Sequence, residues 1–281
     1  DPLSMDGSKT IDDRKNLLKY FYKIIFNSNW SKKRFLEGLE NKFVNSNKLV
    51  VFFQSAEKNK ISILKYKKNW ITFVGKLNKA KGYDVFAKSI KKILNKYPNW
   101  RAKIIGDEKR EKINLSHKNA DVLGFLNHKR VLKIFKQSSI AVACSRWEEP
   151  FGRTSLEAAS RGSAVIISKR GGLPETTSGS IILKELNSNE IFKTIENLIK
   201  NPKKLLKYQK LNYDNFIFDH NYISSLIDDI RLEFQSINNF FIRKEKILKI
   251  MDVTNFNDRF NGRLHYNTGR RLNNGFIRNN H

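Results

Sequence analysis

The sequence predicts an α/β fold in which a parallel sheet carries helices on both faces. Short, almost wholly apolar runs alternate with longer segments whose apolar residues recur at spacings of three and four. The short runs are typical of buried parallel strands, and the longer ones of helices with one apolar face. With 281 residues, 40% of them hydrophobic, the chain can bury the core of one full domain and part of a second.

The alternating runs place the elements in order along the chain. Strands are predicted at 49–53, 71–75, 102–106, 120–124, 140–144, 164–168 and 180–183. Helices are predicted at 83–94, 129–136, 154–160, 190–199, 203–210 and 222–234. Before this block we expect a helix at 12–22, a strand at 23–27 and a second helix capped by Ser31, and after it a strand at 246–253 and a helix that ends near 277. The chain is therefore expected to divide into segments 1–48, 49–235 and 236–281.

Composition narrows the class of protein. Lys and Arg number 54 against 27 Asp and Glu, and the net charge of +27 would suit a polyanion, an anionic membrane surface or a phosphorylated substrate. A general bias towards Lys, Asn and Ile explains the charge as well. Cys144 is the only cysteine, which excludes a disulfide framework and a CxxC site. No apolar stretch approaches the roughly 18 residues of a membrane span, so we expect a cytoplasmic protein.

The first candidate motif follows the strand predicted at 71–75. That strand ends in Gly75, and a basic loop with Lys76 and Lys81 leads into the next helix. Ligands bind at such carboxyl ends of parallel strands, and two ammonium groups beside a helix start could hold a diphosphate. The loop lacks the GxxxxGK[ST] and GxGxxG patterns. In so lysine-rich a chain, plain solvated charge is the alternative.

A second and a third motif follow the strands predicted at 140–144 and 164–168. In the second, Glu149 precedes a Pro-Phe-Gly turn, and Glu157 lies in the helix that the turn opens. Carboxylates there could accept hydrogen bonds from sugar hydroxyls, and free N–H groups at the helix start could hold phosphate oxygens. The third motif, 171–175, contains a Gly-Gly pair that allows close approach of a ligand. The alternatives are an acid that compensates the helix dipole and ordinary turn glycines.

Together these motifs resemble the carboxy-terminal donor-binding domain of the retaining glycosyltransferases of family 4, which have the GT-B fold with a Rossmann-like sheet. The resemblance covers roughly residues 48–234, and the seven residues between Glu149 and Glu157 match that family's EX7E motif. It implies a nucleotide-diphosphate-sugar donor, with Lys76 and Lys81 on the diphosphate, Glu157 on the ribose and Glu149 on the sugar. The family usually has arginine at the position of Lys76, so charge is kept but bidentate geometry is lost.

The resemblance also implies the rest of the site. The catalytic residues would be Glu149, Lys76 and Lys81, with no metal ion and no cofactor besides a UDP-, GDP- or ADP-sugar donor. The acceptor would be a glycan or a lipid-linked molecule of polysaccharide biosynthesis, with peripheral contact to the inner face of the membrane as a further expectation. The remaining donor-binding residues would be Gly75, Gly106, Phe125, Leu126, Phe151, Gly152, Arg153 and Thr154.

The ends of the chain resemble parts of the amino-terminal acceptor domain of the same enzymes. Residues 1–48 are similar to its last helix, strand and helix, and 236–281 to its first strand, loop and helix. We therefore expect a fragment of a tandem polypeptide. Two other functions stay open: binding of a nucleotide sugar without turnover, because the acceptor domain is incomplete, and binding of nucleic acid, which the charge permits but no RRM, KH or zinc-finger pattern supports.

Overall fold

The computed structural model of the chain describes residues 1–58 and 67–238. The chain divides into two compact units, residues 1–229 and 230–281, and the sites discussed below lie in the first. The strand and helix predicted at 246–253 and up to 277 lie outside the described residues. The division into segments 1–48, 49–235 and 236–281 stays a prediction.

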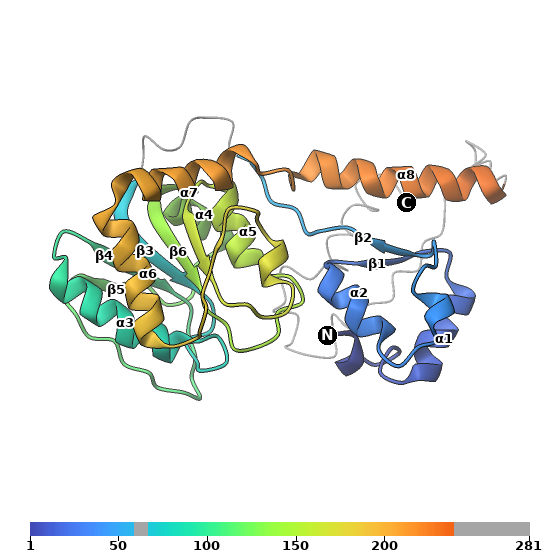
Figure 1. The fold of residues 1–281 in the computed structure, drawn as a ribbon, viewed down its shortest axis with the longest axis horizontal. Helices are drawn as coiled ribbons and strands as arrows, with labels where there is room; N and C mark the ends of the chain where they lie inside the picture. Colours follow the sequence, from blue (N-terminus) through green and yellow to red (C-terminus); the bar gives the residue numbers. More distant parts are fainter. Residues whose placement is uncertain (59–66, 239–281) are drawn as a thin grey trace. The chain divides into compact units, whose positions relative to one another are not determined.

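A six-stranded parallel sheet forms the centre of the first unit (Figure 1). Its order across the sheet is β5-β4-β3-β6-β7-β8. The strands are β3 (Lys68–Val74), β4 (Arg101–Ile105), β5 (Ala120–Val122), β6 (Ser138–Ala143), β7 (Ala164–Ile167) and β8 (Ile181–Ile182). This sheet confirms the predicted α/β fold, and each strand lies within a few residues of its predicted place.

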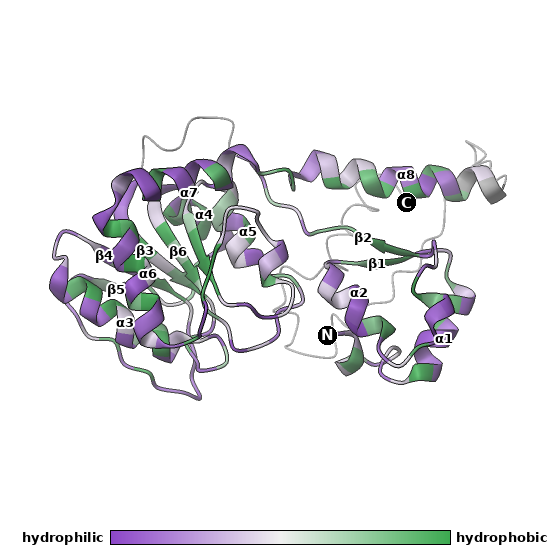
Figure 2. Cartoon of the chain, viewed as in Figure 1, coloured by the Kyte–Doolittle hydropathy of each residue, from purple (hydrophilic) through white to green (hydrophobic). Residues whose placement is uncertain are grey.

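Helices cover both faces of the sheet and explain why the buried parts of its strands are mostly apolar. One core contains the inner faces of α3 (Tyr83–Lys96) and α6 (Ser188–Lys200), and the other those of α4 (His128–Gln137) and α5 (Arg153–Ser160). Successive residues of a strand point to opposite faces, so a strand that is covered on both faces needs apolar residues at successive positions. Figure 2 shows the strands as the most hydrophobic part of this unit. After α6, the chain continues with the helices α7 (Pro202–Asp214) and α8 (His220–Asn238).

The amino-terminal part of the unit has a small core of its own. Four elements form it, namely α1 (Ile11–Tyr20), β1 (Ile24–Phe26), α2 (Asn29–Leu36) and β2 (Leu49–Val51), with two short 3-10 helices, Pro2–Ser4 and Asn41–Phe43. Strand β1 pairs with β2 in a separate two-stranded parallel sheet. Leu18, Phe26, Phe35 and Leu49 are buried together beneath it.

One prediction about this part is confirmed in part, and another is wrong. The strand predicted at 49–53 forms as β2, but it joins β1 and not the large sheet, because Leu49 packs with Phe26 and Phe35. An apolar run of this length contains no information about its partner strand. The second helix is capped by Ser28 and not by Ser31, whose N–H donates to the Ser28 hydroxyl.

Candidate active site

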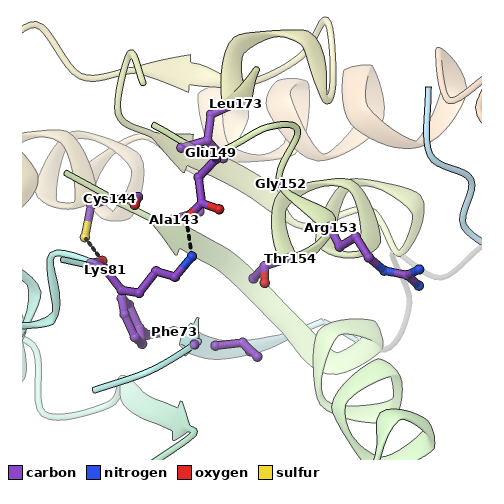
Figure 3. Close-up of a pocket in the computed structure, with 12 residues that line it drawn as sticks. Phe73, Lys81, Ala143, Cys144, Glu149, Gly152, Arg153, Thr154 and Leu173 are labelled. Atoms are coloured by element: carbon purple, nitrogen blue, oxygen red, sulfur yellow. Dashed lines mark hydrogen bonds and ion pairs between the residues drawn. The ribbon is translucent and has the colours of Figure 1, made fainter. Parts of the chain in front are cut away.

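The candidate site lies where the strand order of the large sheet reverses, between β3 and β6. Parallel α/β sheets bind ligands in the crevice outside the carboxyl ends of the strands at such a point. The loops after β3, β6 and β7 meet here around an open pocket, whose empty volume including open solvent is about 430 Å³ (Figure 3). The pocket is lined by Phe73, Val74, Gly75, Lys81, Ala143, Cys144, Ser145, Glu149, Gly152, Arg153, Thr154 and Leu173.

An ion pair between Lys81 and Glu149 crosses this pocket. The ammonium group of Lys81, from the β3–α3 loop, donates a hydrogen bond to Oε1 of Glu149, from the β6–α5 loop (Figure 3). The two side chains are 32% and 16% exposed, so both remain within reach of a ligand. The structure thus brings together a cation and an acid that are 68 positions apart in the chain.

Hydrogen bonds tie the two loops to each other behind this ion pair. The carbonyl of Ala80 accepts from the N–H groups of Arg146 at 2.9 Å and Trp147 at 3.1 Å, and from the Ser145 hydroxyl at 3.2 Å. The Arg146 guanidinium binds both carboxylate oxygens of Asp84, at 2.6 and 2.9 Å. Burial acts to raise the pKa of Asp84, but the hydrogen bond and charge of Arg146 outweigh it and hold the pKa below its usual value. The loops therefore form one rigid frame.

Gly82, the residue before α3, allows the loops to approach this closely. Its φ of 72° is left-handed, and a Cβ there would lie 1.8 Å from the carbonyl oxygen of Cys144. Any side chain at this position would force the Lys81 loop away from β6. Burial raises the pKa of the Cys144 thiol to about 12, so the thiol stays protonated and is no nucleophile at neutral pH.

The two adjacent acids of the β6–α5 loop have different roles. Glu148 accepts hydrogen bonds from the backbone N–H of Gly171 and, at 3.1 Å, from Arg170, and so ties its loop to the one after β7. The backbone carbonyl of Glu149 accepts from Gly172 at 2.7 Å, which leaves the Glu149 side chain for the pocket. The sequence offered no means of separating these two neighbours.

Glu175, in the 3-10 helix Leu173–Glu175, binds the start of α2. Its carboxylate accepts from the N–H groups of Asn29 at 2.7 Å and Trp30 at 2.9 Å. Beside it, the Ser28 hydroxyl donates to the carbonyl of Pro150. A carboxylate at a helix start satisfies free N–H groups and opposes the helix dipole. The third motif therefore supports α2 through Glu175, a role that sequence reasoning missed.

Glu157 is buried on α5 and does not line the pocket. Its Oε1 accepts from Nε2 of His128 at 3.0 Å and from Nε and one terminal nitrogen of Arg153 at 3.2 and 2.9 Å. Figure 3 shows the Arg153 side chain pointing away from the Lys81–Glu149 pair. His128 was not predicted as a site residue, because a histidine without a neighbour at ligand spacing carries no signal in the sequence.

The remaining predicted residues lie in varied surroundings. Lys76 is exposed, and no carboxylate in the described part of the chain pairs with it. Gly106 packs on Gly75, whose carbonyl oxygen would lie 1.8 Å from an added Cβ, and is not among the pocket residues. Phe125 is 75% exposed in the β5–α4 loop, where Leu126 is partly buried. The binding roles of these residues remain predictions.

Phe151 belongs to the hydrophobic core. Its side chain is 1% exposed. The centroid of its ring lies 5.7 Å from the ring centroid of Phe53 and 6.5 Å from that of Phe218. The ring therefore supports the β6–α5 loop from behind and does not face the pocket.

Two kinds of feature are absent from the described residues. No group of three or more His, Cys, Asp or Glu side chains within them is placed to hold a metal ion. In residues 1–58 and 67–238, no helix combines the length and apolar character that crossing a membrane requires.

Solved structures with the same architecture are GT-B glycosyltransferases. Anabaena Alr3699/HepE in complex with UDP has a TM-score of 0.69 at 17% identity, over 83% of this chain and 70% of that one. Sucrose-phosphate synthase from Thermosynechococcus elongatus has a TM-score of 0.65 at 14% identity, over 83% of this chain and 64% of that one. The chain therefore has a GT-B type fold.

The family follows from the sequence. The family model of the glycosyl transferases group 1 matches residues 54–214, more than half of the chain, and the chain belongs to this family. Spore coat protein SA of Bacillus subtilis is 27% identical over 154 residues, which are 49% of this chain and 41% of that protein. A human subunit of phosphatidylinositol N-acetylglucosaminyltransferase is 32% identical over 121 residues, 40% of this chain and 25% of that protein. The matched region thus spans less than half of either relative.

Proposed function

We propose that this chain supplies the donor-binding part of a retaining, metal-independent glycosyltransferase of family 4. The enzyme would transfer a sugar from a nucleotide-diphosphate-sugar to a glycan or lipid-linked acceptor. One observation carries the proposal: Lys81 and Glu149 converge from separate loops on one pocket at the switch point of the sheet, beside the start of α5.

The pocket matches the main electrostatic demand of this reaction. Cleavage of a glycosyl–phosphate bond leaves negative charge on the diphosphate, and fixed positive groups that meet this charge lower the barrier. Lys81, the exposed Lys76 and the free N–H groups at the start of α5 would supply them. Lys81 is paired with Glu149 in the structure. Donor binding would turn Lys81 towards the diphosphate and free Glu149 to accept from a sugar hydroxyl.

The comparisons support the nucleotide-sugar donor. Structures of Anabaena Alr3699/HepE contain UDP and UDP-glucose, and the human relative is named as part of an N-acetylglucosaminyltransferase. The proposal covers UDP-, GDP- and ADP-sugars as donors. It includes the cytoplasmic location expected from the sequence and, for a lipid-linked acceptor, contact with the inner face of the membrane.

Binding of nucleoside diphosphates tests the proposal. Uridine, guanosine and adenosine diphosphates would be added to the chain in a thermal-shift assay, followed by calorimetry. We expect one of them to stabilise the protein, by about 2.7 kcal/mol at 100 times its Kd. A labelled RNA serves as the comparison. Tight binding of RNA without binding of any nucleoside diphosphate would favour the nucleic-acid function and contradict the proposal.

Turnover and stereochemistry are tested separately. The donor sugar that matches the preferred nucleotide would be incubated with the chain, and NMR would record the anomeric configuration of the transferred or released sugar. We expect the configuration of the donor to be retained. An inverted product would contradict the retaining assignment, and binding without product would favour the alternative of a donor-binding chain that lacks turnover.

A further inference from the structure

The two carboxylate oxygens of Glu157 differ in their hydrogen bonds. Its Oε1 accepts three hydrogen bonds, one from His128 at 3.0 Å and two from Arg153 at 3.2 and 2.9 Å. Its Oε2 receives none from the residues that the structure describes. Only 9% of the Glu157 side chain is exposed, so its orientation is set by these contacts and by packing.

This arrangement leaves one oxygen with unused acceptor capacity. Each carboxylate oxygen has two lone pairs, and three donors exceed what Oε1 needs. Among the described residues, Oε2 is not one of the buried side-chain atoms that lack a hydrogen-bond partner. A ligand with adjacent hydroxyl groups would satisfy Oε2, because each hydroxyl donates one hydrogen bond and a carboxylate only accepts.

The two donors come from different elements. Arg153 lies one turn before Glu157 on α5, and its side chain is 43% exposed. His128 is the first residue of α4, whose start is fixed by the Asn127 side chain accepting from the N–H of Arg130 at 3.0 Å. His128 therefore links Glu157 to the β5–α4 loop, which carries the exposed Phe125.

We infer that His128 and Arg153 are positioning residues that hold Oε1 of Glu157, so that Oε2 accepts from the ribose hydroxyls of the donor nucleotide. The inference rests on the proposed function and on the ribose role that the resemblance implies for Glu157, and it adds the two side chains that fix the orientation of that carboxylate. His128 contributes most of the fixation, because it restrains the carboxylate from a second helix, whereas Arg153 moves with α5.

The test measures preference for ribose and not affinity alone. Calorimetry would compare uridine, guanosine and adenosine diphosphates with their 2′,3′-dideoxy counterparts, which lack both hydroxyls. For the base that binds, we expect the wild-type chain to prefer the ribonucleotide. His128→Ala should reduce that preference roughly tenfold, the scale of one hydrogen bond to a charged group. Its affinity for the dideoxy nucleotide should stay within about twofold.

Matched variants separate positioning from folding. His128→Gln keeps a side-chain N–H donor and should restore much of the preference. Lys129→Ala changes the exposed neighbour on α4 and should behave as wild type. If His128→Ala fails to fold, Arg153→Met can be used in its place, because it also removes hydrogen-bond donors to Oε1. The ribose preference of this variant should fall as well.

Each other outcome overturns the inference. His128→Ala could leave the ribose preference unchanged, or it could lower the affinity for the ribonucleotide and the dideoxynucleotide equally. Either result would mean that His128 has only a structural role. A wild-type chain that binds both nucleotides equally would remove Glu157 as the ribose acceptor while the proposed donor function stands. Failure of the wild-type chain to bind any nucleoside diphosphate would overturn the inference together with the proposed function.

Discussion

Two lysines at opposite ends of β3 have entirely different surroundings. Lys81 follows the carboxyl end of the strand, pairs with Glu149 and is open to the pocket. Lys67 precedes the amino end, and its Nζ donates to the carbonyls of Phe135, Ser138 and Arg161 at 3.1, 2.8 and 2.8 Å. Burial lowers the pKa of Lys67 to about 7.

The difference shows that position in the fold, and not residue type, decides what a lysine does here. The last turns of α4 and α5 lie at the amino ends of β6 and β7, and the carbonyl groups there accept from side chains. Lys67 donates to three of them, and the Ser163 hydroxyl donates to two of the same three. The carboxyl ends lead into glycine-containing loops with acids and free N–H groups, where an ammonium group can exchange its carboxylate for a ligand. One end of β3 therefore serves stability and the other binding.

The largest expected effect concerns the pH dependence of stability. In the unfolded chain Lys67 has a pKa near 10.5, and in the fold burial lowers it to about 7. Between these values the unfolded chain binds a proton that the folded chain does not, so stability rises with pH. We expect about 1.4 kcal/mol per pH unit from this group, or roughly 5 kcal/mol over the whole interval.

Urea denaturation of the wild-type chain and of Lys67→Met, at pH 7.5, 8.5 and 9.5, measures this contribution. Subtracting the variant removes the effect of the other lysines and of the falling net charge. The two proteins should diverge as pH rises, with the wild type gaining. If the free energies of unfolding of the two proteins change in parallel with pH, Lys67 titrates normally. The proposed difference between Lys67 and Lys81 would then be wrong.

The second effect concerns binding at the other end of the strand. Lys81→Ala should weaken binding of the preferred nucleoside diphosphate by roughly 1.5–3 kcal/mol, because a charge-assisted hydrogen bond is lost. Lys79→Ala, which changes an exposed lysine in the same loop, should have little effect. Calorimetry would measure both. Equal, negligible losses would argue against a phosphate role for Lys81.

The smallest effect concerns the frame that holds Lys81. A double-mutant cycle with Arg146→Met and Asp84→Asn, measured by urea denaturation, should give a coupling energy of about 1 kcal/mol, since both side chains are partly exposed. The pair Lys42 and Glu40, with side chains 65% and 54% exposed, provides the comparison and should show no measurable coupling. Equal coupling in the two pairs would mean that Arg146 contributes no more than a surface contact.

Much of the fold could be predicted because local pattern and tertiary position agree in the large sheet. Strand β6 from Ile140 onward and the whole of β7 are apolar at successive positions, a pattern that only a strand covered on both faces requires. The pairing of β2 with β1 could not be predicted, because a three-residue apolar run fits either sheet. Phe151 was predicted as a ligand contact from the motif around it, yet its ring completes a core built from distant phenylalanines.

The sequence by itself determined the order of strands and helices along the chain and the loops that follow each strand. It could do so because apolar periodicity and glycine placement are local properties. It also marked Lys81, Glu149 and Glu157 as candidates through their spacing. Only the tertiary structure decided that Lys81 meets Glu149, that His128 binds Glu157 and that Lys67 is enclosed by carbonyls. These contacts join residues far apart in the chain. Only the packing of the folded chain sets the distances between such residues, how deeply they are buried and which charges lie beside them.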